Sequence, residues 1–242
     1  MRILITAGGT RAYIDEVRWI GNVSSGRFGA DIAKACLKRG AEVVHLHAEG
    51  AQLPFHHTID LMADLEPQFA ECRELAQFAS EWHARYRTVP FKKVSEYADE
   101  LERLLRTEPF DVVFLAAAVS DYAPRELPGK IRSDSDEIVV RLARVPKLIA
   151  RVKSWAPNIY QVGFKLLAGA AEEELLEAAR NAALENHSDL TVANDLRPLR
   201  QGNHTIHLVR LGHPTETYSA SENPAERLVE RVLEWQGSSR GE

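Results

Sequence analysis

Hydrophobic and polar positions alternate along this chain in blocks that predict repeated strand–helix units. An apolar run over residues 1–6 predicts a buried strand, and helical periodicity over 27–39 predicts a helix that ends at Gly40. A second strand is expected over 42–47. Because two strands joined by a helix form a right-handed βαβ unit, the pattern indicates a parallel sheet.

The same alternation continues toward the C-terminus. Residues 111–117 are apolar almost throughout, as is typical of a central strand in a parallel sheet. The other periodic segments predict helices over 95–106, 147–154, 171–185 and 225–235, strands over 160–164 and 189–193, and an antiparallel pair over 205–211 and 216–219. We therefore expect a Rossmann-like, doubly wound, mainly parallel α/β sheet with helices on both faces and a small C-terminal antiparallel extension.

The domain organisation follows from the same pattern. A chain of 242 residues is long enough to bury a full core, and we expect one domain over 1–236. Residues 54–90 are polar and partly helical, so 52–94 is interpreted as an insertion or a lid-like segment. Residues 237–242 are expected to be a frayed tail.

The charge balance excludes some classes of partner. A net charge of −5 argues against bulk binding of nucleic acid, which needs a dense basic surface. No apolar run approaches the roughly 20 residues of a membrane span, and the first residues already form a predicted strand without a signal-peptide pattern. We expect a cytoplasmic protein with neither a nucleic acid nor a membrane as partner.

Cysteine and histidine usage suggests no metal centre. Cys36 and Cys72 share no close motif and indicate no disulfide framework. The histidines, including His45 and His47, lack the spacing of zinc ligands and more plausibly line a strand and a loop.

Two loops have the composition of phosphate sites. Asn22–Gly29 places two serines and two glycines where the chain opens a helix, so backbone N–H groups, serine hydroxyls and the helix dipole can all face an anion. A simpler interpretation is that Ser-Ser-Gly only caps the helix. A second glycine turn, Thr6–Arg11, directly follows the first strand and favours the phosphate site.

Polar residues also follow the other predicted parallel strands. Ligands of doubly wound sheets bind outside the carboxyl ends of the strands, and four loops would converge on one crevice there. These loops contain Gly8–Thr10, Ala118–Asp121, Gly163–Lys165 and Asn194–Asp195.

These motifs, in this order, resemble the phosphopantothenate–cysteine ligase family, which includes the C-terminal domain of the DNA/pantothenate metabolism flavoproteins. The resemblance covers about residues 3 to 196 and rests on Thr6–Arg11, Asp15–Arg18, Asn22–Gly26, Ala116–Tyr122, Lys130–Ile131, Gly163–Lys165 and Val192–Asp195. It implies a ligase that joins 4′-phosphopantothenate to L-cysteine through an acyl nucleotide, with release of pyrophosphate, in coenzyme A biosynthesis.

The resemblance also implies partners and cofactors. The nucleoside triphosphate is CTP or ATP, and Mg²⁺ is expected to arrive with it. A homodimer is expected, and no flavin in this chain. Because fused bacterial forms carry a flavin-dependent decarboxylase before this domain, whereas this sequence starts at Met1, a separate phosphopantothenoylcysteine decarboxylase is expected as pathway partner.

Individual roles follow from the matching positions. By resemblance, Lys130 is the cation on the transferring phosphates, and Asn22 donates to the acyl oxygen as it becomes an oxyanion. Arg18, Asn22 and Ala118 are expected to bind substrate. The nucleotide is expected to contact Gly8, Gly9, Thr10, Ser24, Ser25, Gly26, Ala117, Asp121, Gly163, Phe164 and Lys165, with Asp121 toward the ribose and Phe164 toward the base. Asn194 and Asp195 are structural or line the site.

Simpler interpretations exist for the three residues nearest the chemistry. Lys130 could be an ordinary exposed loop lysine, Asn22 could form an Asx turn, and Arg18 could make a surface salt bridge.

The sequence departs from the family pattern in places. Lys165 is followed by Leu-Leu-Ala, where many relatives carry an acidic residue after the aromatic. Leu184–His187 stands where many bacterial members carry a lysine that reaches the triphosphate, which leaves the nucleotide choice open.

Two other classes of function remain open. An NAD(P)-dependent reductase could use the same fold, although Gly8–Thr10 lacks the full GxGxxG pattern and the second strand offers only Glu49 for a ribose. A non-catalytic nucleotide-binding regulatory subunit would fit the missing lysine.

Overall fold

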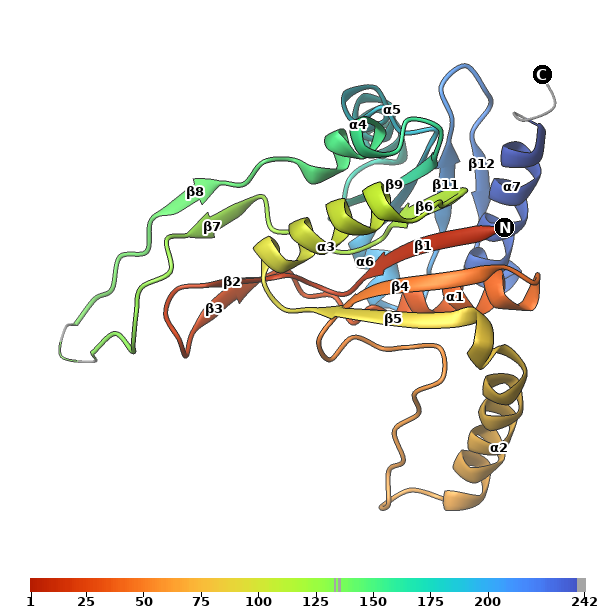
Figure 1. Ribbon diagram of the computed structural model, residues 1–242, viewed down its shortest axis with the longest axis horizontal. Helices are drawn as coiled ribbons and strands as arrows, with labels where there is room; N and C mark the ends of the chain where they lie inside the picture. The colour runs from red at the N-terminus through yellow and green to blue at the C-terminus, as the bar shows by residue number, and fades with distance from the viewer. Residues whose placement is uncertain (133, 135, 239–242) are drawn as a thin grey trace.

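An eight-stranded sheet forms the centre of the fold in the computed structural model, which describes residues 1–132, 134 and 136–238 (Figure 1). Its order is β12-β11-β10-β9-β6-β1-β4-β5. Neighbours from β10 to β5 pair in parallel, and β11 and β12 continue the sheet as an antiparallel extension. The strands are β1 (Arg2–Ala7), β4 (Glu42–Ala48), β5 (Tyr86–Phe91), β6 (Val112–Leu115), β9 (Tyr160–Leu167), β10 (Leu190–Asp195), β11 (Ile206–Val209) and β12 (Glu216–Tyr218). The predicted doubly wound fold is confirmed.

Helices cover both faces of this sheet because alternate strand residues point to opposite sides. α1 (Arg27–Lys38) and α7 (Pro224–Ser238) bury their apolar sides, with Ile32 and Val229, against residues such as Ile3 and Val162. The opposite face carries α3 (Val94–Thr107), the turn η2 (Leu148–Arg151) with α4 (Val152–Trp155), and α5 (Glu172–Asn186). Short helical segments α6 (Leu196–Arg200) and η3 (Ala220–Glu222) complete the C-terminal part.

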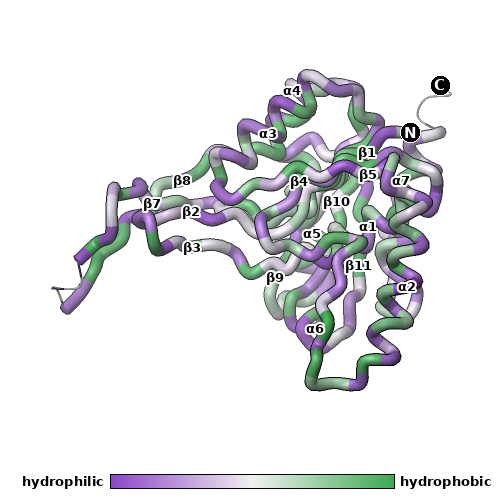
Figure 2. The backbone as a smooth tube through the Cα atoms, turned by 60° about the horizontal axis from the view of Figure 1, so that its bottom comes forward, coloured by the Kyte–Doolittle hydropathy of each residue, from purple (hydrophilic) through white to green (hydrophobic). Residues whose placement is uncertain are grey.

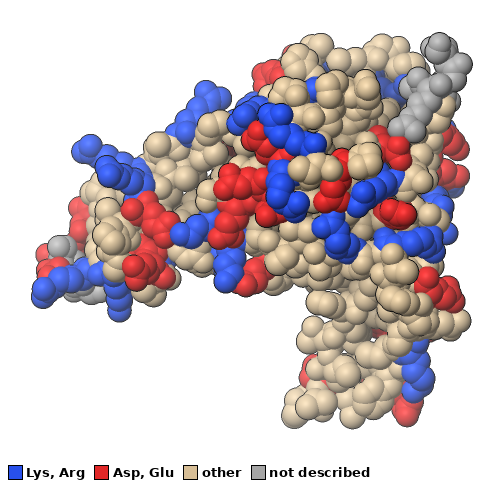
Figure 3. All heavy atoms as spheres, viewed as in Figure 1, with Lys and Arg blue, Asp and Glu red and all other residues tan. Residues whose placement is uncertain are grey.

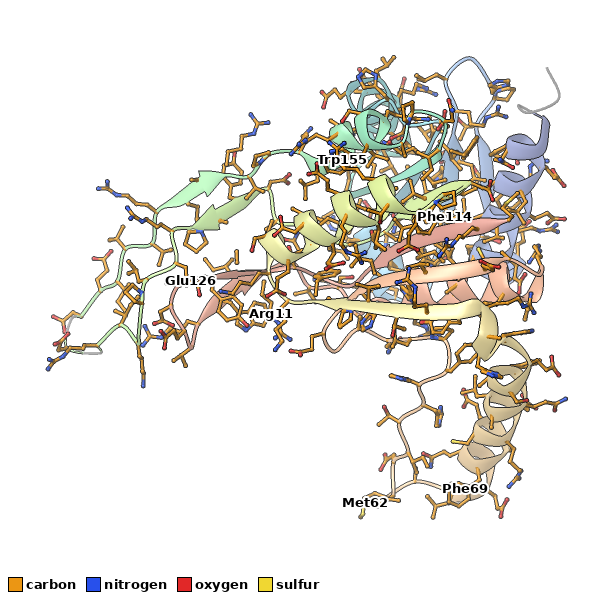
Figure 4. The ribbon with its side chains drawn as sticks, in the orientation of Figure 1. Arg11, Met62, Phe69, Phe114, Glu126 and Trp155 are labelled. Carbon is orange, nitrogen blue, oxygen red and sulfur yellow. The ribbon has the colours of Figure 1, made fainter. Side chains whose placement is uncertain are left out.

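The segment interpreted as an insertion, 52–94, contains both a projecting helix and a strand of the main sheet. α2 (Leu65–Trp82) and the turn η1 (His83–Arg85) lead into β5, and Trp82 stacks on Phe78 with ring centroids 5.0 Å apart. Figure 4 places Met62 and Phe69 at the free end of this projection, away from the sheet. Sequence analysis missed β5, whose Pro90 fits only an edge strand because proline cannot donate to a ladder.

The tail differs from expectation at its start. Residues 237–238 belong to α7, and 239–242 lie outside the described residues.

An arm of two antiparallel pairs extends from the carboxyl side of the sheet (Figures 1 and 2). It consists of β2 (Arg11–Tyr13) with β3 (Trp19–Gly21), and β7 (Tyr122–Pro124) with β8 (Leu142–Arg144). Lys93 Nζ is 2.8 Å from the Glu126 carboxylate and lies over the Tyr13 ring, so the two pairs are joined near their base. The described residues between β7 and β8 form neither helix nor strand, and the amides of Leu127, Gly129 and Ile131 attach them to the residues between β2 and β3.

Candidate functional site

The strand order reverses between β1 and β6, and the loops after these two strands are joined to each other. The amide of Ala118 donates to the carbonyl of Gly8 at 2.8 Å, and the amide of Thr10 donates to the carbonyl of Ala118 at 3.2 Å. We call residues 8–10 and 116–121 the switch loops. Doubly wound folds bind ligands at this point because the two chain crossovers diverge there and leave the loops open.

Asn22 lies against the switch loops. Its side-chain amide donates to the carbonyl of Val119 at 3.2 Å. A Cβ at Gly9 would lie 2.5 Å from the backbone oxygen of Asn22, so only glycine allows this approach. The Asn22 side chain thus bridges two loops that are distant in sequence and does not form the local Asx turn.

The first turn of α1 follows directly. Gly26 is the N-cap residue, with φ of +76°, and as a glycine it has no side chain that could cap the helix. The hydroxyl of Ser25 accepts from the amide of Arg27 at 3.4 Å, while its carbonyl accepts from the amide of Gln52 at 2.8 Å. The hydrogen bond by which Ser25 caps the helix is therefore long and weak. The positive end of the helix dipole is available to an anion.

An aromatic group borders this turn. The ring of Phe28 makes edge contacts with Phe164 at 6.1 Å and with His204 at 4.3 Å between centroids. Burial, and secondarily the charge of Arg27, lower the pKa of His204, so its imidazole is neutral at pH 7. Sequence analysis named Phe164 but missed Phe28 and His204, because contacts between residues so distant in sequence leave no local signal.

Gly163 and Lys165 lie on the other face of β9 from Phe164. A Cβ at Gly163 would lie 3.1 Å from the side chains of both Ile149 and Ser188, so this position serves close packing. The carboxylate of Glu185 accepts from Lys147 at 3.0 Å, and this hydrogen bond, with the nearby charge of Lys165, lowers the pKa of Glu185. Basic side chains therefore gather around Glu185, near the end of α5.

Asp15 joins the two antiparallel pairs of the arm to each other. Its side chain is fully buried and accepts from the amides of Val17, Arg18 and Ile131 at 2.9, 2.6 and 3.0 Å. Burial acts to raise the pKa of Asp15, but these amides and the Arg18 charge outweigh it and the pKa is lowered. The Arg18 guanidinium lies 3.5 Å from Asp15 and donates to the Ile131 carbonyl at 3.0 Å.

Lys130 sits between two anchored neighbours. Gly129 exchanges hydrogen bonds with Glu16, its amide donating to the carboxylate at 3.0 Å and its carbonyl accepting at 3.1 Å. Lys130 itself is exposed, and within the described residues its side chain has no hydrogen-bond or ion-pair partner. Figure 1 shows the segment 127–132 toward the outer end of the arm, away from the switch loops.

The carboxylate of Asp195 holds neighbouring backbone segments in place. It caps α6 and accepts from the amides of Gly169, Ala170 and Arg197 at 2.6, 3.1 and 2.7 Å. Burial acts to raise the pKa of Asp195, but these three donors prevail and lower it.

The predicted site residues thus fall into three places. The switch loops and α1 turn bring together Gly8, Gly9, Thr10, Asn22, Ser24, Ser25, Gly26, Ala117, Ala118 and Asp121. Phe164 joins them through Phe28. Arg18 and Lys130 belong to the arm, and Gly163, Lys165, Asn194 and Asp195 lie along β9 and β10.

Three further observations concern metal ligands, membrane spans and surface charge. In the described ranges, no three His, Cys, Asp or Glu side chains converge on a possible metal position. Of the helices that the structure describes, none is both long and apolar enough to cross a membrane. Acidic and basic side chains are mixed over the face seen in Figure 3, without a dense basic surface.

Comparison with known proteins gives consistent matches. The chain is 34% identical over 86% of its length to the coenzyme A biosynthesis bifunctional protein CoaBC of Thermococcus kodakarensis, covering 44% of that protein. It is 30% identical over 80% of its length to the human phosphopantothenate–cysteine ligase, covering 72% of it. The chain spans about half the length of the archaeal bifunctional relatives.

Solved structures agree with these relatives. The DNA/pantothenate metabolism flavoprotein of Streptococcus pneumoniae matches with a TM-score of 0.79 and 27% identity, over 97% of this chain and 99% of that one. A Cab2 mutant in complex with phosphopantothenate-cysteine matches with a TM-score of 0.83 and 25% identity, over 98% and 86% of the two chains. The family model for the DNA/pantothenate metabolism flavoprotein C-terminal domain matches residues 1–67 and 75–235, and the chain belongs to this family.

Proposed function

We propose that this protein joins 4′-phosphopantothenate to L-cysteine in coenzyme A biosynthesis, through an acyl nucleotide and with release of pyrophosphate. The observation that carries the proposal is the meeting of Asn22, the switch loops and the weakly capped start of α1 at one point of the sheet. Relatives named phosphopantothenate–cysteine ligase support the reaction, as does the neighbour in complex with phosphopantothenate-cysteine.

In the first half-reaction, an oxygen of the substrate carboxylate attacks the α-phosphorus of CTP or ATP. A carboxylate–phosphorus bond forms, the bond to the β-phosphate oxygen breaks, and pyrophosphate leaves. Backbone amides at the start of α1, together with Ser24 and Ser25, hold the phosphates, because this end of the helix carries partial positive charge. Mg²⁺ would accompany the triphosphate and neutralise part of its charge, and it needs few ligands from the protein.

In the second half-reaction, the amine of cysteine attacks the acyl carbon and a carbon–nitrogen bond forms. The bond from this carbon to the phosphate oxygen breaks, the nucleoside monophosphate leaves with that oxygen, and the nitrogen releases a proton to solvent. The carbonyl oxygen carries negative charge in this step. The Asn22 amide has two hydrogens, and the bond to the Val119 carbonyl holds one of them. The other hydrogen is thereby oriented to stabilise the oxyanion.

The nucleotide is CTP or ATP, and basic residues on this chain can replace the absent lysine. Lys165 and Lys147 both lie close enough to Glu185 to lower its pKa, which places two cations beside the carboxyl half of β9. We propose that Lys165 provides the charge toward the triphosphate.

We further propose that two copies associate through the arm. Val139 is 75% exposed, and a groove of about 580 Å³ is lined by apolar residues of the arm including Leu127, Ile131 and Ile138. Such a surface is uncommon on a monomer, and identical copies most often pair about a two-fold axis. In a dimer, the arm with Lys130 would reach a neighbouring copy, and light scattering of wild type and Val139→Asp tests the association. A monomeric wild type contradicts it.

The product of the proposed ligase also needs an enzyme that consumes it. We propose that a phosphopantothenoylcysteine decarboxylase acts on this product, and the archaeal relatives that support the proposal are named as bifunctional proteins.

The decisive experiment separates the two half-reactions. Asn22→Asp replaces the amide donor by a negative charge at nearly constant volume. Losing such a donor typically costs about 3 kcal/mol, roughly a hundredfold in rate. We expect the acyl nucleotide to accumulate in the mutant when phosphopantothenate, nucleotide and cysteine are mixed, as measured by mass spectrometry of quenched samples.

A matched control is Val23→Ala, because Val23 is the adjacent residue and is 97% exposed. This variant should form product at the wild-type rate with CTP or with ATP. Absence of phosphopantothenate-dependent pyrophosphate release in the wild type would overturn the proposed reaction and favour a reductase or a non-catalytic subunit. Product formation by Asn22→Asp at the wild-type rate would remove Asn22 from the acyl site.

A further inference from the structure

A polar cavity lies at the amino-terminal edge of the sheet, opposite the switch loops. It has a volume of about 670 Å³ and is lined by α4, the starts of β9 and β10, the β11–β12 turn and the end of α7. Figure 1 shows α4 and the β11–β12 turn in the upper part of the molecule. None of the residues assigned to the proposed reaction lines this cavity.

Among the described residues, the cavity contains one arginine that forms no ion pair. The Arg210 guanidinium lies over the Trp235 ring, 4.4 Å from its centroid, and in the described part of the chain it makes no hydrogen bond or ion pair. The charge of Arg210 contributes to the lowered pKa of Glu216, but the carboxylate of Glu216 is bound at 2.6 Å by Arg231. Stacking fixes the plane of the guanidinium and leaves its N–H groups available for a ligand.

The other charges of the cavity balance each other. Lys153 Nζ lies 2.6 Å from Asp189 and donates to the Ile159 carbonyl at 2.6 Å. The same Asp189 oxygen accepts from the amide of Gln161 at 2.6 Å. With Lys153 and Asp189 paired, Arg210 leaves the cavity with net positive charge.

A buried donor without an acceptor lies in the cavity wall. Tyr160 is 8% exposed, and its hydroxyl is covered and has no hydrogen-bond partner among the described residues. Burial raises the pKa of Tyr160 to about 12, so the hydroxyl carries its proton at neutral pH. Arg210 and Asp189 are both near enough to Tyr160 to influence this pKa. Buried polar groups are nearly always hydrogen-bonded, so an acceptor is expected at this point.

We propose that this cavity binds a small oxyanion, a phosphate monoester or a carboxylate, between Arg210 and Tyr160. The guanidinium fork matches the paired oxygens of both groups, and the phenol supplies a further donor. The site is separate from the proposed reaction and does not depend on it.

Calorimetric titration tests this site with two probes, inorganic phosphate and acetate, at constant ionic strength. We compare the wild type with Arg210→Gln and Tyr160→Phe, and use Arg180→Gln as a control that removes an exposed charge on α5. Phosphate can also bind at the start of α1. The difference between the binding isotherms of the wild type and Arg210→Gln therefore reports binding in the cavity alone.

Loss of the charged fork should raise the Kd at least about tenfold, and loss of the phenol hydroxyl should raise it roughly fivefold. Arg180→Gln should bind as the wild type does. Saturable binding of phosphate or of acetate that weakens in this order supports the site and identifies the oxyanion. Identical isotherms for the wild type and Tyr160→Phe, or no saturable binding, overturn it. Tyr160→Phe keeps the test valid if Arg210→Gln fails to fold, because its hydroxyl has no partner to lose.

Discussion

Replacing Gly9 by alanine tests whether the position of Asn22 sets the rate of the proposed ligase. The added Cβ would lie 2.5 Å from the Asn22 carbonyl oxygen, whereas real Cβ atoms essentially never come closer than 3.0 Å. The Asn22 backbone must therefore move by at least about 0.5 Å, since the switch loop is fixed by its bonds to Ala118. Overpacking of this kind costs about 1–3 kcal/mol of unfolding free energy.

The same displacement should slow the reaction. Displacing a catalytic group by about 1 Å slows a reaction roughly a hundredfold, and active sites hold such groups within about 0.5 Å of the productive position. We therefore expect kcat to fall at least about tenfold, which corresponds to about 1.4 kcal/mol of transition-state stabilisation. Pyrophosphate release at saturating substrates gives kcat, and urea unfolding gives the stability.

The control is Gly237→Ala, because Gly237 lies in α7 with nothing within 4 Å of an added Cβ. It should keep wild-type kcat and gain slightly in stability from helix propensity. If Gly9→Ala is destabilised but its folded form turns over at the wild-type rate, the position of Asn22 does not limit catalysis. That result refutes the reasoning.

Three other substitutions test separate parts of the site. Lys130→Gln should slow pyrophosphate release strongly with an unchanged melting temperature, because we propose that this exposed lysine of the arm reaches the phosphates in a neighbouring copy and it supports no core. Unchanged turnover would remove Lys130 from the site. Gly26→Val should weaken calorimetric binding of CTP or ATP beyond its effect on stability, because φ is +76° and the new Cβ would lie 2.7 Å from the Ala51 Cβ; wild-type affinity in a folded variant would leave the loop as a helix cap. Asp15→Asn should lower the free energy of unfolding at pH 7, and this free energy should then decrease less in acid than it does in the wild type. The pKa of Asp15 is lowered in the fold, so its contribution is present above the ordinary carboxyl range and disappears as pH falls through the folded value. Urea midpoints at pH 7 and pH 3 give this difference, and parallel curves for the two proteins would count against it.

The sequence by itself determined the strands of the main sheet other than β5. Apolar runs such as 111–117 are long, continuous and bounded by polar turns, so burial on both faces is the arrangement that satisfies them. The glycine turns after β1 and before α1 could also be predicted from the local sequence. Gly26 adopts positive φ, and Gly9 approaches the chain too closely for any side chain.

Only the tertiary structure decided the arm and the contacts within the site. β5 and the short strands of the arm carry weak local patterns, because their stability comes from pairing with residues far away in sequence. The bond from Asn22 to Val119 spans 97 positions, and the bond from Ile131 to Asp15 spans 116. Periodicity reports burial against a neighbouring layer, but it does not report which distant polar groups exchange hydrogen bonds. Those pairings are fixed when the sheet brings the carboxyl ends of its strands to a common edge.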